Sequence, residues 1–137
     1  MDRAFEDIAK DEPGTVYYDE HSGGVRLLVL RGPCSVNAYL GVPLSHPLAG
    51  FDYDDLPLDV HGGLTFSSEG GGNSGFPEGW FWYGWDYAHA GDRPMYDSSF
   101  RKRGKEWTPK MVYQEAKQAL WDFRRLAGLA EKIKGVE

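Results

Sequence analysis

Two glycine-flanked histidines are the residues of this sequence best suited to acid–base chemistry. His61 lies in DVHGGLTFS (59–67) and His89 in GWDYAHAGD (84–92), each within three residues of an aspartate. A histidine takes up or releases a proton near neutral pH, so a convergent pair can supply a general base and a general acid for one reaction. The neighbouring glycines let a substrate approach the backbone closely. The two motifs therefore predict a two-histidine site.

Neighbouring polar residues would complete the catalytic part of such a site. If the first motif is a strand with a side-chain period of two, Asp59, His61 and Thr65 share one face. Thr65 would then donate a hydrogen bond to a phosphate oxygen. Asp59 or Asp86 would orient an imidazole ring and fix its tautomer. The expected catalytic residues are His61, His89, Thr65 and Asp86.

A second group of residues would bind the substrate. Arg93 and the basic run RKRGK (101–105) carry positive charge that can hold an anion, although such a run is more often a solvated turn. Tyr83 and Tyr87 share a face with His89 if the aromatic strand before it extends that far, and they would stack on a base. The expected substrate-binding residues are Arg93, Tyr83, Tyr87 and Asp92.

Two other interpretations of the histidines stay open. A histidine beside a carboxylate on a strand is often a structural hydrogen-bonding residue. The histidines could also bind zinc, manganese or iron together with Asp59, Asp86 and Asp92, because these metals accept nitrogen and carboxylate ligands. The sequence contains no His-x-His pair. We therefore expect neither a metal nor another cofactor.

Other reactive or aromatic residues are assigned to structural positions. His21 is expected in an exposed turn, and His46 in a long ordered loop over 43–58. The single cysteine, Cys34, lies near neither histidine motif and is expected to be buried. The tryptophans of WFWYGWDYA (80–88) are expected in the core.

Composition and charge indicate which partners to expect. The 137 residues are 41% hydrophobic and 15% aromatic, which is enough for one domain (1–137) with a buried core. A net charge of −6 argues against diffuse binding to long nucleic acids. One cysteine suits a reducing cytoplasm, and no run resembles a signal peptide or a membrane span. We expect a cytoplasmic protein without a membrane partner.

Hydrophobic period and turn residues predict the strands. A short helical turn over 2–10 precedes two apolar segments, VRLLVL (25–30) and SVNAYLGV (35–42), which RGPC would join as a hairpin. A strand over 59–67 would alternate with period two. The segment 80–88 is aromatic on both faces, which is typical of a central strand that is covered on both sides.

The last element is a long helix. Thr108 is a suitable cap before Pro109 at the first helical position. An apolar stripe at helical spacing continues to about residue 133. Its members are Val112, Ala116, Ala119, Leu120, Phe123, Leu126, Ala127 and Ala130. The elements together predict an α+β fold, a small antiparallel sheet with a long C-terminal helix packed on one face.

The segments YLGVPLSHPLAGFDYDD, LDVHGGLTFS and WYGWDYAHAGD resemble a widespread family of small tailed-phage and prophage proteins, over about residues 26–92. This family is similar in type to the phage phosphodiesterases that cut the cyclic oligonucleotides of CBASS defence. The resemblance implies a site made of His61 and Thr65 in one motif and of His89 and Asp92 in the other. Tyr87 stands where a smaller residue, often cysteine, is expected, which leaves the shape of the pocket open.

Together these features predict a phage anti-defence phosphodiesterase that cleaves cyclic di- or trinucleotides in the cytoplasm of the infected bacterium. His61 and His89 would be base and acid, in either order. The ligand would be a cyclic oligonucleotide or another phosphate-bearing small molecule. The alternatives are a non-catalytic sponge for a nucleotide signal, a metal-dependent hydrolase, and a structural or host-interaction protein. The aromatic content is compatible with a homo-oligomer or a monomer.

Overall fold

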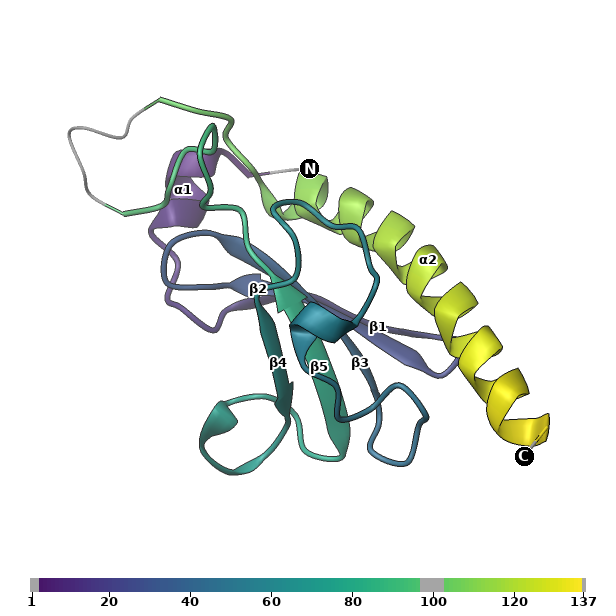
Figure 1. Cartoon of the computed structure of the whole chain (residues 1–137). Coiled ribbons are helices and arrows are strands. Elements are labelled where there is room, and N and C mark those ends of the chain that lie inside the picture. The colour runs from purple at the N-terminus through teal and green to yellow at the C-terminus, as the bar shows by residue number, and fades with distance from the viewer. Residues whose placement is uncertain (1–2, 97–102, 137) are drawn as a thin grey trace.

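The computed structural model describes residues 3–96 and 103–136, which form an antiparallel sheet crossed by a long helix (Figure 1). The strand order is β1-β2-β3-β5-β4, and each neighbouring pair is antiparallel. In chain order the elements are α1 (Phe5–Ala9), β1 (Val16–Ser22), β2 (Val25–Arg31), β3 (Val36–Pro43), η1 (Tyr53–Asp55), β4 (Phe66–Glu69), η2 (Gly72–Ser74), β5 (Trp80–Trp85) and α2 (Pro109–Val136). The predicted α+β fold is confirmed.

The inner strands of the sheet are covered on both faces, which explains their nearly continuous apolar sequences. On β2, Leu27 and Val29 belong to the main core, whereas Leu28 belongs to a smaller cluster on the opposite face. On β5, Trp85 belongs to the main core and Trp82 to the smaller cluster. The aromatic segment after residue 79 is therefore buried on both sides, as its sequence predicts.

The helix α2 begins where the sequence predicts its cap. Pro109 is its first residue, and the N–H of Val112 donates to the carbonyl of Thr108 at 3.0 Å. The helix packs on β2 and β3 and covers one face of the sheet (Figure 1). The buried members of the predicted stripe are Val112, Ala116, Ala119, Leu120, Phe123 and Ala127, and the half-buried members are Leu126 and Ala130. The predicted packing of this helix is confirmed.

The predicted strand over 59–67 is wrong. The strand β4 begins only at Phe66, and His61 and Gly62 form a turn. The reason lies in the two glycines of the motif, because Gly62 and Gly63 adopt φ angles of 70° and 81°. An extended strand requires negative φ, so the period of two does not hold here and does not set a common face for His61 and Thr65.

Three further predictions differ from the structure. The strand β5 ends at Trp85 instead of continuing to residue 88. His21 lies not in a turn but on the edge strand β1, where it is exposed opposite Arg26. The residues of β1 are exposed or half-buried, so this strand lacks the apolar alternation that identifies strands in a sequence. Cys34, expected to be buried, is half-buried between β2 and β3.

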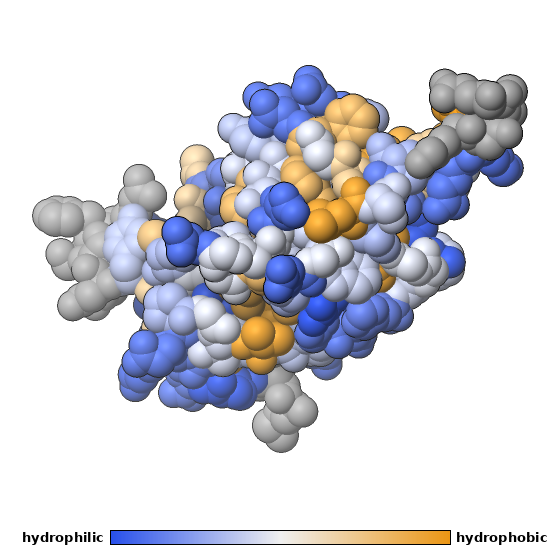
Figure 2. Space-filling model, turned by 90° about the horizontal axis from the view of Figure 1, so that it is seen from below, coloured by the Kyte–Doolittle hydropathy of each residue, from blue (hydrophilic) through white to orange (hydrophobic). Residues whose placement is uncertain are grey.

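The described part of the surface carries large apolar side chains at several separate positions. On the face shown in Figure 2, small hydrophobic patches are separated by polar residues. Among the described residues, the exposed large apolar side chains are Val16, Leu44, Phe51, Tyr96, Trp121, Leu129 and Ile133. Within the described ranges, no helix combines the length and the apolar character needed to cross a membrane.

Candidate functional site

The two histidine motifs converge near the carboxyl end of β5. His61 lies in the loop that leads into β4, and His89 lies in the segment that follows β5. A parallel bridge between Asp92 and Lys105 ties this segment to the residues that precede α2. As a result the imidazole rings of His61 and His89 are neighbours, with centroids 5.7 Å apart and an interplanar angle of 62°.

Asp92 is the buried carboxylate that holds this cluster together. Its Oδ2 accepts hydrogen bonds from Nε2 of His61 at 2.7 Å and from the backbone N–H of His89 at 3.0 Å, and its Oδ1 accepts one from Nε1 of Trp107 at 2.9 Å. The side chain is 4% exposed. Burial by itself raises the pKa of Asp92, but these hydrogen bonds outweigh it, so the pKa lies below its ordinary value. Asp92 is therefore ionised at neutral pH.

This carboxylate determines where His61 carries its proton. An ionised carboxylate only accepts hydrogen bonds, so Nε2 of His61 must be protonated. The ring stacks on Tyr87, with centroids 4.6 Å apart and planes within 10°, and lies 5.1 Å from the ring of Trp107. Nδ1 of His61 forms no hydrogen bond with the described residues, yet it is not a buried atom. In the neutral ring, Nδ1 carries a lone pair that solvent can reach, as a general base requires.

His89 is held in a different way. Its Nε2 lies 2.9 Å from Oδ1 of Asp86, which is close enough for an ion pair but too poorly aligned for a hydrogen bond, and this nitrogen is buried. Two lone pairs at this distance would repel each other, so the proton belongs on Nε2. Gly62 leaves room for the ring, because a Cβ at this position would collide with the imidazole of His89. Asp86 therefore lies where it can orient His89.

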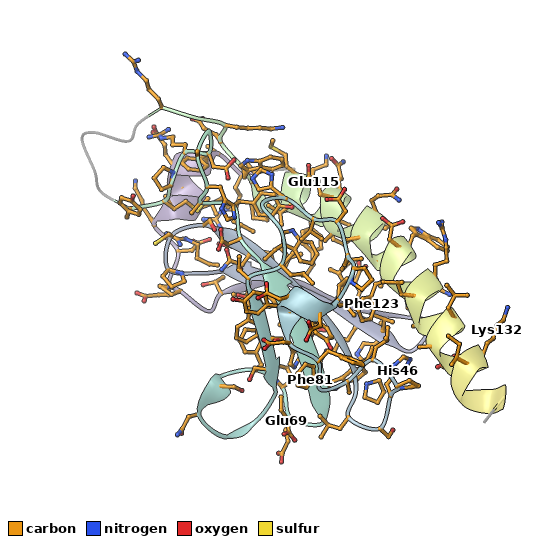
Figure 3. All side chains as sticks on the ribbon, in the orientation of Figure 1. His46, Glu69, Phe81, Glu115, Phe123 and Lys132 are labelled. Carbon is orange, nitrogen blue, oxygen red and sulfur yellow. The ribbon has the colours of Figure 1, made fainter. Side chains whose placement is uncertain are left out.

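A pocket of about 380 Å³ opens beside His61, between its loop, the end of β5 and α2. Its volume lies within the range of small-molecule sites. The polar lining consists of Asp59, His61, Tyr87, Glu115, Gln118 and Asp122. Glu115 projects from the N-terminal part of α2 (Figure 3) and accepts a hydrogen bond from the Tyr87 hydroxyl at 2.9 Å. Among the described residues, the lining contains three carboxylates and neither lysine nor arginine, so this part of the pocket is acidic.

Of the eight residues that the sequence suggested for the site, two line this pocket, namely His61 and Tyr87; the other six do not, namely His89, Asp86, Asp92, Thr65, Tyr83 and Arg93. Thr65 is exposed, and its hydroxyl has no hydrogen bond within the described part of the chain. Tyr83 is fully buried in the core, where its hydroxyl donates to a backbone carbonyl at 2.5 Å. The guanidinium of Arg93 pairs with Glu106 at 2.9 Å and with Glu6 at 3.5 Å. These three side chains are therefore not placed to contact a ligand in the pocket.

Tyr87 lines the pocket and also supports His61, whereas Asp92 supports His61 from outside the lining. The ring of Tyr87 is fully buried and packs against both His61 and Trp107. Trp107 and Glu115 belong to the site although the sequence did not suggest them. Trp107 precedes the cap of α2 and Glu115 flanks its apolar stripe, and no spacing marks either residue because both join the histidines only across the fold.

A metal-dependent mechanism would need a set of clustered ligands. Within residues 3–96 and 103–133, no three His, Cys, Asp or Glu side chains are grouped so that they could hold a metal ion. Comparison of the chain with protein-family models, with curated proteins and with solved structures gave no match. The resemblance to phage proteins and the activity that it implies therefore stay predictions.

Proposed function

We propose that this chain is a phosphodiesterase that cleaves a cyclic oligonucleotide, with His61 as general base and His89 as general acid. The observation that supports this most directly is the hydrogen bond of 2.7 Å between Nε2 of His61 and Asp92. A buried carboxylate that fixes one ring nitrogen leaves the other as the base, as in hydrolases with a His–Asp pair. The ring of His89 lies beside it, 5.7 Å between centroids, which suits a second proton-transfer group.

The proposed reaction uses Nδ1 of each ring. Nδ1 of His61 takes the proton of a ribose 2′-hydroxyl or of a water molecule, and the resulting oxygen nucleophile attacks phosphorus. The bond between phosphorus and the leaving oxygen breaks, and protonated His89 gives its Nδ1 proton to that oxygen. Asp92 lies beside His61 and Asp86 lies beside His89, so each ring has a carboxylate that can orient it for proton transfer.

The biological setting of this proposal comes from the sequence motifs. Their resemblance to small phage proteins favours a cyclic di- or trinucleotide immune signal, cut in the cytoplasm of an infected bacterium. The net charge of −6 favours a small ligand over a long nucleic acid. Under this proposal the protein protects a phage from host defence.

A sponge that binds the nucleotide without cutting it is the second candidate, and the charge of the pocket favours it. No lysine or arginine of the described residues 3–96 and 103–133 lines the pocket. Arg93, the cation suggested by the sequence, is paired with two glutamates. Cations of this kind usually stabilise the charge that develops on a transferring phosphoryl group. A site without them would bind through stacking and hydrogen bonds and cleave slowly.

Incubation of the purified protein with a panel of cyclic di- and trinucleotides, with and without a chelator, tests the proposal by chromatography. We expect product peaks that persist in the chelator, and a bell-shaped pH–rate profile. His61→Asn and His89→Asn should each lower the rate by roughly 10²- to 10⁴-fold. His46→Asn is the matched control, because His46 pairs with Glu131 at the other end of α2 from Glu115 (Figure 3).

The outcomes separate the candidates. Recovery of an intact ligand from a stable complex supports the sponge. A rate that falls in the chelator indicates a metal-dependent hydrolase instead. An equal loss of rate in His46→Asn means that the histidine variants act through stability and not through the site. If no cyclic nucleotide is cut or retained, both candidates are refuted.

A further inference from the structure

The pocket beside His61 is the middle of a longer groove along α2. It shares Asp59 and Asp122 with a neighbouring hollow of about 260 Å³. It shares Glu115 and Gln118 with a second hollow of about 340 Å³, nearer the start of the helix. A ligand that fills the middle pocket can therefore extend along the helix in both directions.

The side chains of the middle pocket mainly accept hydrogen bonds. The carboxylates of Asp59, Glu115 and Asp122 have no ion-pair partner among the described residues. Nδ1 of neutral His61 is also an acceptor, because Asp92 holds the proton on Nε2. The aromatic donors of the lining are already engaged, since Nε1 of Trp85 donates to the hydroxyl of Tyr87 and this hydroxyl donates to Glu115. The middle pocket thus suits a ligand group that presents hydrogen-bond donors.

The two ends of the groove carry the opposite charge. Lys105 lines the hollow near the start of α2, where its Nζ lies 4.0 Å from the ring centroid of Trp107. Arg125 lines the hollow at the other end. Neither cation pairs with a carboxylate in the part of the chain that the structure describes. Each end is therefore suited to an anionic group.

We infer that the middle pocket binds the donor edge of a guanine base while Lys105 and Arg125 hold phosphate groups on either side, an inference that rests on the proposed nucleotide ligand. Guanine presents N1–H and its 2-amino group side by side, so both can donate to the two oxygens of one carboxylate. Adenine and hypoxanthine each offer one donor on this edge. Glu115 is the carboxylate best fixed for the contact, because the Tyr87 hydroxyl holds its Oε1.

Calorimetric titration of the intact chain with GMP, IMP, AMP and CMP tests the base contact. We expect GMP to bind about tenfold more tightly than IMP, because IMP lacks the 2-amino group and cannot make the two-donor contact with Glu115. Glu115→Gln should remove this preference, because an amide offers one donor and one acceptor. Glu131→Gln is the matched control, the same change on the same helix at a side chain that is 61% exposed and outside the groove. Thermal unfolding of each variant verifies that it is folded.

A comparison of GMP with guanosine tests the phosphate contact. We expect Lys105→Gln to weaken binding of GMP roughly fivefold and to leave guanosine unchanged, whereas Arg103→Gln affects neither. Exposed Arg103 lies outside the groove and serves as the control for charge alone. An equal effect of Lys105→Gln on the two ligands overturns the phosphate contact.

Other outcomes overturn the base contact. Equal affinity for GMP and IMP does so, as does a guanine preference that survives Glu115→Gln. Displacement of GMP by spermidine at equal concentration would indicate a general amine site and would also overturn it. The proposed function fails separately, because a guanine preference without cleavage of any cyclic nucleotide leaves the present inference intact. Cleavage without a guanine preference leaves the proposed function intact and removes the inference.

Discussion

Asp92→Asn is the most direct test of how the candidate site is held together. Asp92 accepts three hydrogen bonds, from His61, from the backbone of His89 and from Trp107. An asparagine has one acceptor oxygen. If this oxygen stays with the histidines, the indole N–H of Trp107 faces the amide NH₂ of the asparagine and loses its acceptor. A buried donor left without a partner costs about 1–3 kcal/mol, and each remaining bond loses about 1 kcal/mol without the charge. We expect the free energy of unfolding to fall by about 3–5 kcal/mol at pH 7.

The same variant also predicts a pH dependence. Hydrogen bonding lowers the pKa of Asp92 in the folded protein below its value in the unfolded chain, although burial opposes this. The carboxylate therefore contributes stability that is fully present above about pH 4, the ordinary pKa of an aspartate, and is lost as the pH falls through the lower folded value. The difference in unfolding free energy between the wild type and Asp92→Asn should therefore have its largest value at pH 7 and should shrink below about pH 4.

Urea unfolding followed by tryptophan fluorescence, at pH 7 and at several values down to pH 3, measures both effects. Asp59→Asn is the control, because Asp59 is an exposed carboxylate near His61 and has no hydrogen-bonded partner within the described ranges. We expect this control to change the unfolding free energy by no more than about 0.5 kcal/mol. A loss below about 1 kcal/mol in Asp92→Asn, or a loss that does not change with pH, would refute the assignment of Asp92 as an ionised anchor.

Two further pairs of variants test the turn and the core. Gly62→Ala should lower the free energy of unfolding by about 2–4 kcal/mol and reduce any activity, because the new Cβ collides with His89. Gly63→Ala has open space around its Cβ and should cost only the backbone strain of about 1–2 kcal/mol. Equal urea midpoints for the two alanine variants would contradict the role of Gly62. Phe123→Ala should cost about 3–5 kcal/mol because the ring is fully buried, whereas Trp121→Ala, 58% exposed, should change stability by no more than about 0.5 kcal/mol. Thermal unfolding compares this pair, and similar losses would show that α2 packs through another face.

The amino-acid sequence determined those elements whose burial follows a local period. The helix α2 could be predicted from its cap at Thr108 and from an apolar stripe at helical spacing, because the side of a helix that faces a core repeats every 3.6 residues. The hairpin of β2 and β3 could be predicted from two apolar runs separated by a short turn. The edge strand β1 could not be predicted in this way, since it has little apolar surface to bury. The start of β4 could not be predicted either, because the positive φ angles of Gly62 and Gly63 interrupt the alternation.

For the site, the sequence determined which residue types can transfer protons, and the tertiary structure decided which carboxylate serves which histidine. Asp59, two residues before His61, is exposed at the pocket. Asp92, 31 residues away, accepts the hydrogen bond that Nε2 of His61 donates. Hydrogen-bond partners of this kind depend on where loops meet after folding and not on sequence separation. The acidic lining supplied by Glu115 of α2 arises for the same reason. Spacing in the sequence therefore locates the histidines. Packing between the loops and α2 decides which ring nitrogen faces a carboxylate and which carboxylates line the pocket.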